Sequence, residues 1–310
     1  MGQALLHGDV RALARAISVV EEQRPGALEL LRDVFGRTGT ATVIGLTGPP
    51  GSGKSSLCDR LVEGYRGEGR RVGVVAVDPS SAFSGGAILG DRIRMLRHAQ
   101  DENVFIRSMA TRGHLGGLAQ ATNDVVDLID AAGFDPVLVE TVGVGQDEIE
   151  VVRTADVVAV VLVPGMGDDI QAIKAGILEI ADLFVINKAD LPGADKLEAE
   201  LRYMLDLGAA TARPRPAILR TVAVRGEGLD AVREGARAFL GSAGRERRAA
   251  RRRERAEARL RAVLSERALR WVVARTLGGD GWDGVVEQIA ARKVDPYSAA
   301  DKLIERLEVQ

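Results

Sequence analysis

The feature that most constrains the fold of this chain is a series of short apolar runs that alternate with stretches of helical character. The runs are rich in valine and isoleucine and read VIGLTG, VGVVAVD, VFIRSMA, PVLVETV, VVAVVLVP, LFVINKAD and AILRTVAV. Strands that alternate with helices form right-handed βαβ units and therefore a parallel sheet. Because the runs are apolar at nearly every position, we expect helices on both faces of that sheet. The sequence predicts an α/β fold with a doubly wound, mostly parallel sheet.

Helical segments flank the predicted sheet on both sides. Residues 5–35 place apolar side chains at helical spacing on either side of Pro25 and Gly26, which predicts two amphipathic helices. Beyond the sheet, a segment dense in arginine, glutamate and alanine predicts one long helix. Asp295 and Pro296 then predict the start of a final helix. We expect an N-terminal helical extension at 1–40, a sheet domain at 41–240 and a C-terminal helical arm at 241–310.

Composition excludes several classes of protein. The 310 residues carry 42 basic and 44 acidic side chains, whereas proteins that mainly neutralise a nucleic-acid backbone are usually basic. Cys58 is the only cysteine, so one chain forms no disulfide and no cysteine-based zinc site. The apolar run Val157–Val163 ends at Pro164, far short of the roughly twenty residues of a membrane span. With no targeting signal recognised at the N-terminus, we expect a cytoplasmic protein without nucleic-acid or membrane partners.

The arginine-rich stretch 245–261 has two readings. It is compatible with a patch for nucleic acid or an acidic partner, but Glu246, Glu254 and Glu257 interrupt the positive charge. A solvated helix face is the favoured reading.

One segment matches a phosphate-binding pattern in both spacing and context. Residues 48–55 read GPPGSGKS and lie between a predicted strand and a predicted helix. The glycines let backbone N–H groups point at phosphate oxygens, and the helix N-terminus adds partial positive charge. Lys54 supplies a charge for the β and γ phosphates, and Ser55 offers a hydroxyl to Mg²⁺. The predicted nucleotide-binding residues here are Gly48, Pro49, Pro50, Gly51, Ser52, Gly53, Lys54, Ser55 and Ser56.

A second segment indicates which base is bound. Residues 187–190 read NKAD at the end of another predicted strand and match N-K-x-D. Guanine presents a ring N–H and a 2-amino group side by side, which the carboxylate of Asp190 accepts together. Adenine would leave that carboxylate unpaired. We expect Asn187 to brace the loop and the stem of Lys188 to cover the base, so GTP and GDP are the predicted substrate and product.

Acidic residues near the carboxyl ends of the predicted strands are candidates for the metal site, since ligands bind at that edge of an open α/β sheet. Asp78, Asp91 and Glu140 fit this description. Asp78 is also a candidate helix cap, and Asp91 a candidate loop charge. Gly143 is placed to let a main-chain N–H reach the γ-phosphate. Gln146 is a candidate for orienting the attacking water but lies some distance from Gly143, so the catalytic base stays unassigned.

Taken together, these segments resemble one family, the methylmalonyl-CoA mutase-associated GTPases of the MeaB type, which belong to the P-loop class. The strings that carry the resemblance run nearly from end to end: GDVRALARAISVVE, IGLTGPPGSGKSSL, VAVDPSS, GAILGDRIRM, RSMATRGHLGGLAQAT, VETVGVGQ, PGMGDDIQAIKAGILEIAD, NKAD and DPYSAADKL. The resemblance implies a GTPase that docks on an adenosylcobalamin-dependent acyl-CoA mutase. It would gate cofactor loading and protect or reactivate the mutase, meeting adenosylcobalamin only through that partner.

The resemblance also implies roles for individual residues. The C-terminal helices look like the family's homodimerisation element. Residues 167–176 look like a switch loop that couples nucleotide state to the mutase. The implied catalytic residues are Lys54, Asp91, Glu140 and Gly143; the implied Mg²⁺-side residues are Ser55, Asp78, Asp91 and Glu140; the switch-loop candidates are Gly167, Asp168, Asp169, Gln171 and Lys174.

One segment departs from the family pattern. The last guanine-contacting loop, usually Ser-Ala after a threonine, here follows Thr221 with Val222, Ala223 and Val224. In the family these contacts are made largely by backbone N–H groups. The resemblance therefore still implies GTP binding through this loop.

Two other functions remain as alternatives. A nucleotide-dependent kinase linked to amino-acid transport would need a base for the acceptor and typically ATP, and the NKAD segment argues against it. A metal-delivery GTPase for another metalloenzyme is disfavoured because the sequence has no histidine- or cysteine-rich tract. The sequence does not distinguish which acyl-CoA the partner mutase handles.

Overall fold

The computed structural model consists of two compact units, Met1–Arg251 and Arg252–Gln310. Their boundary falls at Arg251, inside a helix, so the expected division at 40 and 240 remains a prediction. The described residues are 1–78, 96–98, 100–110, 117–141, 155–165, 180–207, 215–241, 244–277 and 281–308.

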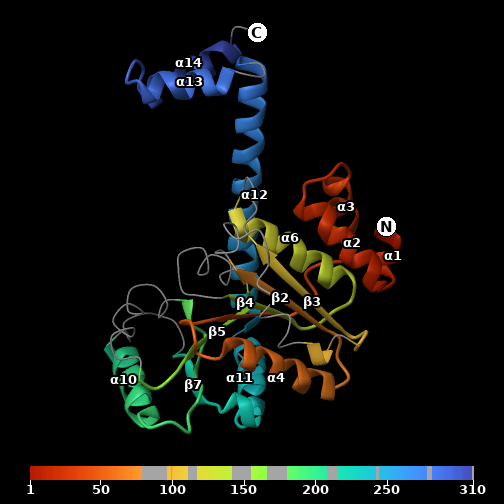
Figure 1. Cartoon of the computed structure of the whole chain (residues 1–310), viewed down its shortest axis with the longest axis vertical. Coiled ribbons are helices and arrows are strands. Elements are labelled where there is room, and N and C mark those ends of the chain that lie inside the picture. The colour runs from red at the N-terminus through yellow and green to blue at the C-terminus, as the bar shows by residue number, and fades with distance from the viewer. Residues whose placement is uncertain are drawn as a thin grey trace. The chain divides into compact units, whose positions relative to one another are not determined.

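A seven-stranded parallel sheet forms the centre of the first unit (Figure 1). Its strand order is β3-β2-β4-β1-β5-β6-β7, and each neighbouring pair is parallel. All seven predicted strands are present, which confirms the α/β fold. The strands are β1 (Val43–Thr47), β2 (Val72–Asp78), β3 (Val104–Ala110), β4 (Val137–Thr141), β5 (Val157–Leu162), β6 (Leu183–Ile186) and β7 (Ala217–Arg220).

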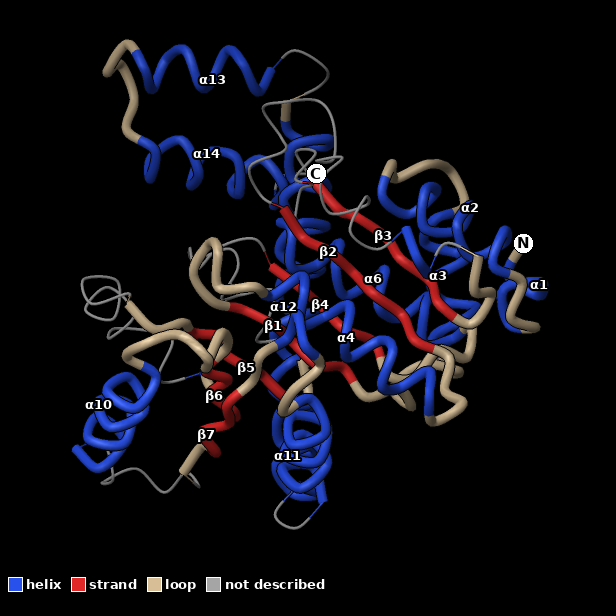
Figure 2. Tube along the Cα trace, turned by 60° about the horizontal axis from the view of Figure 1, so that its bottom comes forward, coloured by secondary structure: helices blue, strands red, loops and turns tan. Residues whose placement is uncertain are grey.

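Helices cover both faces of this sheet (Figure 2). On one face lie α4 (Lys54–Gly67) and α11 (Leu229–Gly241), in the cluster that contains Ile44 and Leu46 of β1. On the other face lie α6 (Gly117–Ala131) and α10 (Ala194–Leu207), in the cluster that contains Val43. Alternate side chains of each strand enter opposite layers, and both layers are buried. This double burial explains why the runs lack a polar face.

The N-terminal helices belong to the core of the first unit. They are α1 (Gly2–Leu6), α2 (Val10–Glu21) and α3 (Ala27–Phe35), of which α1 was not predicted. The carboxylate of Asp9 caps α2 by accepting from the amide of Ala12 at 2.9 Å. Leu13 and Ile17 of α2 are fully buried in the cluster that contains α6. The carboxylate of Asp130 on α6 accepts from the amides of Thr40 and Ala41, which fixes the entry into β1.

Three helices make up the C-terminal part of the chain. They are α12 (Gly244–Thr276), within which the unit boundary lies, α13 (Gly281–Ala290) and α14 (Pro296–Glu308). The predicted long helix and the predicted final helix are therefore confirmed. Asp295 caps α14 by accepting from the amides of Tyr297 and Ser298 at 3.0 and 2.9 Å. Among the described residues, no helix combines the length and apolarity that crossing a membrane requires.

Candidate nucleotide-binding site

The phosphate-binding segment leaves β1 as a tight loop that ends in α4. Three glycines of the loop have positive φ angles, 147° at Gly48, 76° at Gly51 and 86° at Gly53. A Cβ on Gly48 would lie 2.1 Å from the carbonyl oxygen of Val161 in the neighbouring strand β5. The loop therefore passes the sheet edge only because this position has no side chain. The geometry brings the backbone of residues 48–53 to the N-terminus of α4, where helix N–H groups attract anions.

Lys54 places a positive charge inside this loop. Its side chain is buried, with 5% exposed, although it begins an α-helix. The ammonium Nζ donates to the carbonyl oxygens of Gly48 and Pro49 at 2.8 and 3.0 Å. The lysine side chain thus reaches across the loop, from position 54 back to Gly48 and Pro49. The charge and the helix N-terminus together make this loop favourable for phosphate oxygens.

The next residue joins the loop to the central strand β4. The hydroxyl of Ser55 donates to Oε1 of Glu140 at 2.5 Å, and Glu140 is 4% exposed. Glu140 lies opposite Leu46 of β1 and Ala76 of β2, one residue before the end of β4 between them. A hydroxyl and a carboxylate are oxygen donors of the kind that Mg²⁺ prefers. The pair fits the predicted metal side of the site.

The base-recognition segment begins with a buried asparagine at the end of β6. Asn187 is 2% exposed, and its amide Nδ2 donates to the carbonyl of Ser52 at 2.9 Å. Its Oδ1 accepts from the hydroxyl of Thr221 and the amide of Ala223, each at 3.1 Å. One side chain therefore connects the phosphate loop, the end of β6 and the loop after β7. The structure brings both sequence motifs into one site.

The contact between these motifs also explains why position 53 is a glycine. A Cβ on Gly53 would lie 2.4 Å from Nδ2 of Asn187. Lys188, which follows Asn187, adopts a φ of 53°, and its Nζ donates to the carbonyl of Gly51 at 2.9 Å. Asn187 and Lys188 thus both contact main-chain atoms of the phosphate loop. The covering of a base by the stem of Lys188 remains a prediction.

Asp190 meets the loop that follows β7. Its Oδ2 forms an ion pair with Nη2 of Arg225 at 3.2 Å. Arg225 ends the short helix η3 (Ala223–Arg225), and the amide of Val222 before it donates to the carbonyl of Glu227 at 3.1 Å. The amides of Val222 and Ala223 are thus engaged within the protein, and their predicted contact with guanine is untested. Arg225 was missed because no motif includes it; its charge, opposite to that of Asp190, was the available signal.

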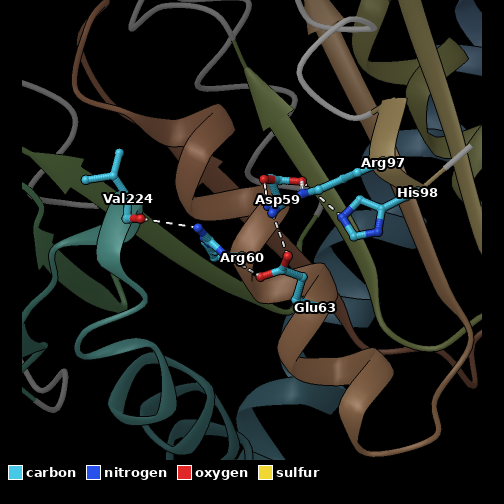
Figure 3. A network of polar contacts seen from close by, with 6 residues as sticks. All are labelled: Asp59, Arg60, Glu63, Arg97, His98 and Val224. Atoms are coloured by element: carbon cyan, nitrogen blue, oxygen red, sulfur yellow. Dashed lines mark hydrogen bonds and ion pairs between the residues drawn. The ribbon is translucent and has the colours of Figure 1, made fainter.

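A network of polar contacts joins α4 to η2 (Leu96–His98) and to the loop after β7 (Figure 3). Asp59 accepts from Nε of Arg97 at 2.7 Å and lies 3.0 Å from Nε2 of His98, both in η2 (Leu96–His98). Burial lowers the pKa of His98, and the adjacent Arg97 lowers it further. Glu63 pairs with Arg97 at 2.5 Å and accepts from Arg60 at 2.8 Å. These contacts fix η2 to the helix that begins at the phosphate loop.

Arg60 extends this network to the base side of the site. Its Nη2 donates to the carbonyl of Val224 at 3.2 Å, as Figure 3 shows. Sequence reasoning missed Arg60 because a charged helix residue ordinarily indicates only a solvated face. The contact ties α4 to the loop after β7.

Several predicted site residues lie outside the described part of the chain. Asp78 ends β2 opposite Ala110, and its side chain is outside that part. The others are Asp91, Gly143, Gln146 and the switch-loop candidates Gly167, Asp168, Asp169, Gln171 and Lys174. Their roles stay predictions. Cys58, in contrast, is fully buried in the layer under α4, as a small apolar residue would be.

Comparison with known proteins adds to this geometry. The family model described as "Methylmalonyl Co-A mutase-associated GTPase MeaB" matches residues 13–276. A Pyrococcus abyssi protein named as a GTPase is 48% identical over 307 residues, which cover 97% of this chain and 94% of the relative. The mouse protein "Methylmalonic aciduria type A homolog, mitochondrial" is 38% identical over 243 residues, 73% of this chain and 59% of the relative.

A solved structure extends the similarity to the whole fold. The crystal structure of a protein named "LAO/AO transport system kinase" matches with a TM-score of 0.69 and 26% sequence identity. The match covers 99% of this chain and 96% of that one. The similarity therefore includes the sheet, the N-terminal helices and the C-terminal helices.

Proposed function

The chain belongs to the family of methylmalonyl-CoA mutase-associated GTPases and is itself a P-loop GTPase, and from this premise we propose that it serves as a GTP-hydrolysing chaperone of an adenosylcobalamin-dependent acyl-CoA mutase. In this role it gates cofactor loading and protects or reactivates the mutase. We propose that it acts as a cytoplasmic homodimer. It binds adenosylcobalamin only through its partner.

The observation that carries the nucleotide part of the proposal is the hydrogen bond from Asn187 to Ser52. It holds a phosphate loop and a base-recognition segment at a fixed separation, as one nucleoside triphosphate requires. Residues 48–56 would bind the phosphates. The base would be bound by Asn187, Lys188 and Asp190. The loop of Val222, Ala223 and Val224 completes the proposed guanine site, although the amides of Val222 and Ala223 also donate to Glu227 and Asn187 within the protein.

The residues of this chain supply positioning and electrostatic stabilisation, which dominate catalysis of phosphoryl transfer. Lys54 would move from the carbonyls of Gly48 and Pro49 to the β and γ phosphates, because both are hydrogen-bond acceptors for its ammonium. Ser55 and Glu140, with Asp78 and Asp91, would hold Mg²⁺, which neutralises charge on the transferred phosphate when bound. The amide of Gly143 would bind the γ-phosphate.

Support for the mutase partner comes from names of related proteins. The matched family is described as associated with methylmalonyl-CoA mutase, and the mouse relative is named after methylmalonic aciduria. The proposed switch loop, with Gly167, Asp168, Asp169, Gln171 and Lys174, would report nucleotide state to that partner. The precise acyl-CoA substrate of the mutase is left open.

A transport-linked kinase is the alternative suggested by the name of the solved structure. Such an enzyme would transfer phosphate from ATP to a protein, whereas Asp190 is suited to guanine. Comparison of GDP with ADP in a binding assay separates the two functions. Tight ADP binding with weak GDP binding would favour the kinase.

The chaperone proposal is tested by titrating the purified chain with a methylmalonyl-CoA mutase, or a close relative of it, from the same organism. We expect GTP turnover to rise with mutase concentration and a nucleotide-dependent complex to form on size-exclusion chromatography. The Lys54→Ala variant serves as the control for contaminating hydrolysis. Neither stimulation nor complex formation with any nucleotide would overturn the partner assignment while leaving the GTPase itself intact.

A further inference from the structure

The guanidinium group of Arg225 lies beside the carboxylate that is expected to read the base. Nη2 of Arg225 is 3.2 Å from Oδ2 of Asp190, although the two residues are separated by α10 and β7. The Arg225 side chain is 59% exposed and the Asp190 side chain 31%. The pair therefore lies at the surface, where a base would enter, rather than in the core.

The backbone that carries Arg225 is held in place from several directions. The amide of Arg225 donates to the carbonyl of Val222 at 2.9 Å, and Arg60 of α4 binds the carbonyl of Val224 at 3.2 Å. The turn then closes at Gly228, where a Cβ would lie 2.1 Å from the carbonyl oxygen of Arg220. The backbone from which the Arg225 side chain reaches Asp190 is therefore held in place on both sides.

The chemistry of guanine recognition gives this pair a use. A carboxylate offers about four lone-pair sites, and guanine needs two of them for its ring N–H and its 2-amino group. One contact with Arg225 leaves enough sites for the base.

We propose that Arg225 is a positioning residue for guanine, which orients the carboxylate of Asp190 toward the ring N–H and the 2-amino group of the base. The proposal rests on the nucleotide site proposed above and adds a residue that neither sequence motif contains. Arg225 acts through its ion pair with Asp190.

The test compares the binding of GDP with that of inosine diphosphate, which lacks the 2-amino group, by calorimetry on the full chain. For Arg225→Ala we expect GDP to bind about threefold to fivefold more weakly, the scale of an exposed ion pair. The affinity for inosine diphosphate should fall by a smaller factor, because this nucleotide makes only one of the two hydrogen bonds to Asp190. The ratio of the two affinities should therefore fall. Arg225→Lys should restore part of the ratio.

Arg215→Ala is the matched control, since Arg215 forms an exposed ion pair with Asp206 at 2.8 Å on another element. It should leave both affinities unchanged. An unchanged or tighter GDP affinity in Arg225→Ala would overturn the proposal, as would equal losses for both nucleotides, which indicate only a disturbed loop. If the wild-type chain binds no GDP, the nucleotide site itself fails, and the inference fails with it.

Discussion

The side-chain amide of Asn187 donates a hydrogen bond to the main-chain carbonyl of Ser52 across 2.9 Å and so joins two segments that lie 135 residues apart. The same side chain accepts two further hydrogen bonds from the loop after β7. A buried amide with all of these contacts is costly to displace. The spacing between the phosphate loop and the base segment is therefore set by buried contacts within the protein.

The crowding of Gly53 by Asn187 gives a prediction about stability. Alanine at Gly51 or at Gly53 has to adopt a left-handed backbone, which costs about 1–2 kcal/mol. Only at Gly53 does the new Cβ meet Asn187, whereas Gly51 has no atom within 4 Å of that position. Gly53→Ala should therefore lower the free energy of unfolding by about 1–3 kcal/mol more than Gly51→Ala does, because it displaces the buried amide of Asn187. Urea unfolding of the nucleotide-free variants measures the difference, and equal losses would contradict the contact.

The hydrogen bond between Ser55 and Glu140 gives a prediction about magnesium. Glu140→Gln keeps the shape of the side chain but removes its charge, and it weakens the orientation of the Ser55 hydroxyl. The Mg²⁺ concentration for half-maximal GTP hydrolysis should rise by about tenfold to a hundredfold, as for other groups that support a metal ligand. Ser55→Ala should raise it as well, while Ser55→Thr should stay near the wild type because its hydroxyl remains. A Glu140→Gln enzyme with an unchanged Mg²⁺ requirement would remove Glu140 from the metal side.

The buried His98 gives a prediction about pH. Burial, together with Arg97, lowers its pKa below the usual 6.5, although Glu63 and Asp101 act in the opposite direction and Arg66 adds to the lowering. The unfolded chain therefore takes up a proton near pH 6.5 that the folded chain resists. The stabilisation is present above pH 6.5 and is lost as the pH falls toward the lowered pKa.

We expect His98→Asn to lose less stability than the wild type between pH 7 and about pH 5.5, a window set by the usual histidine pKa. Thermal or urea unfolding over this range measures the slope. His7→Asn is the control, because His7 is exposed and lies on the first unit away from α4. Parallel pH profiles for wild type and His98→Asn would contradict the assignment.

How much of this site the sequence could predict depends on the kind of contact. The sheet was predictable because its central strands β1, β4, β5 and β6 are buried on both faces, and the phosphate loop because its spacing reflects backbone geometry. Helix α1 is only five residues long, too short to show a helical period. The pairs of Asp190 with Arg225 and of Asp59 with Arg97 join charges from different elements. Spacing along a chain brings such residues to one edge of a sheet but does not select which charges pair.

The measurement that tests the guanine site most directly is the nucleotide preference of Asp190→Asn. Xanthine has a carbonyl where guanine has the 2-amino group, so an asparagine amide can donate where Asp190 accepted. We predict that the variant binds xanthosine diphosphate and that its GDP affinity falls on the order of a hundredfold or more, since two hydrogen bonds to a charged group are lost. A variant that keeps the wild-type preference for GDP over xanthosine diphosphate would contradict the account.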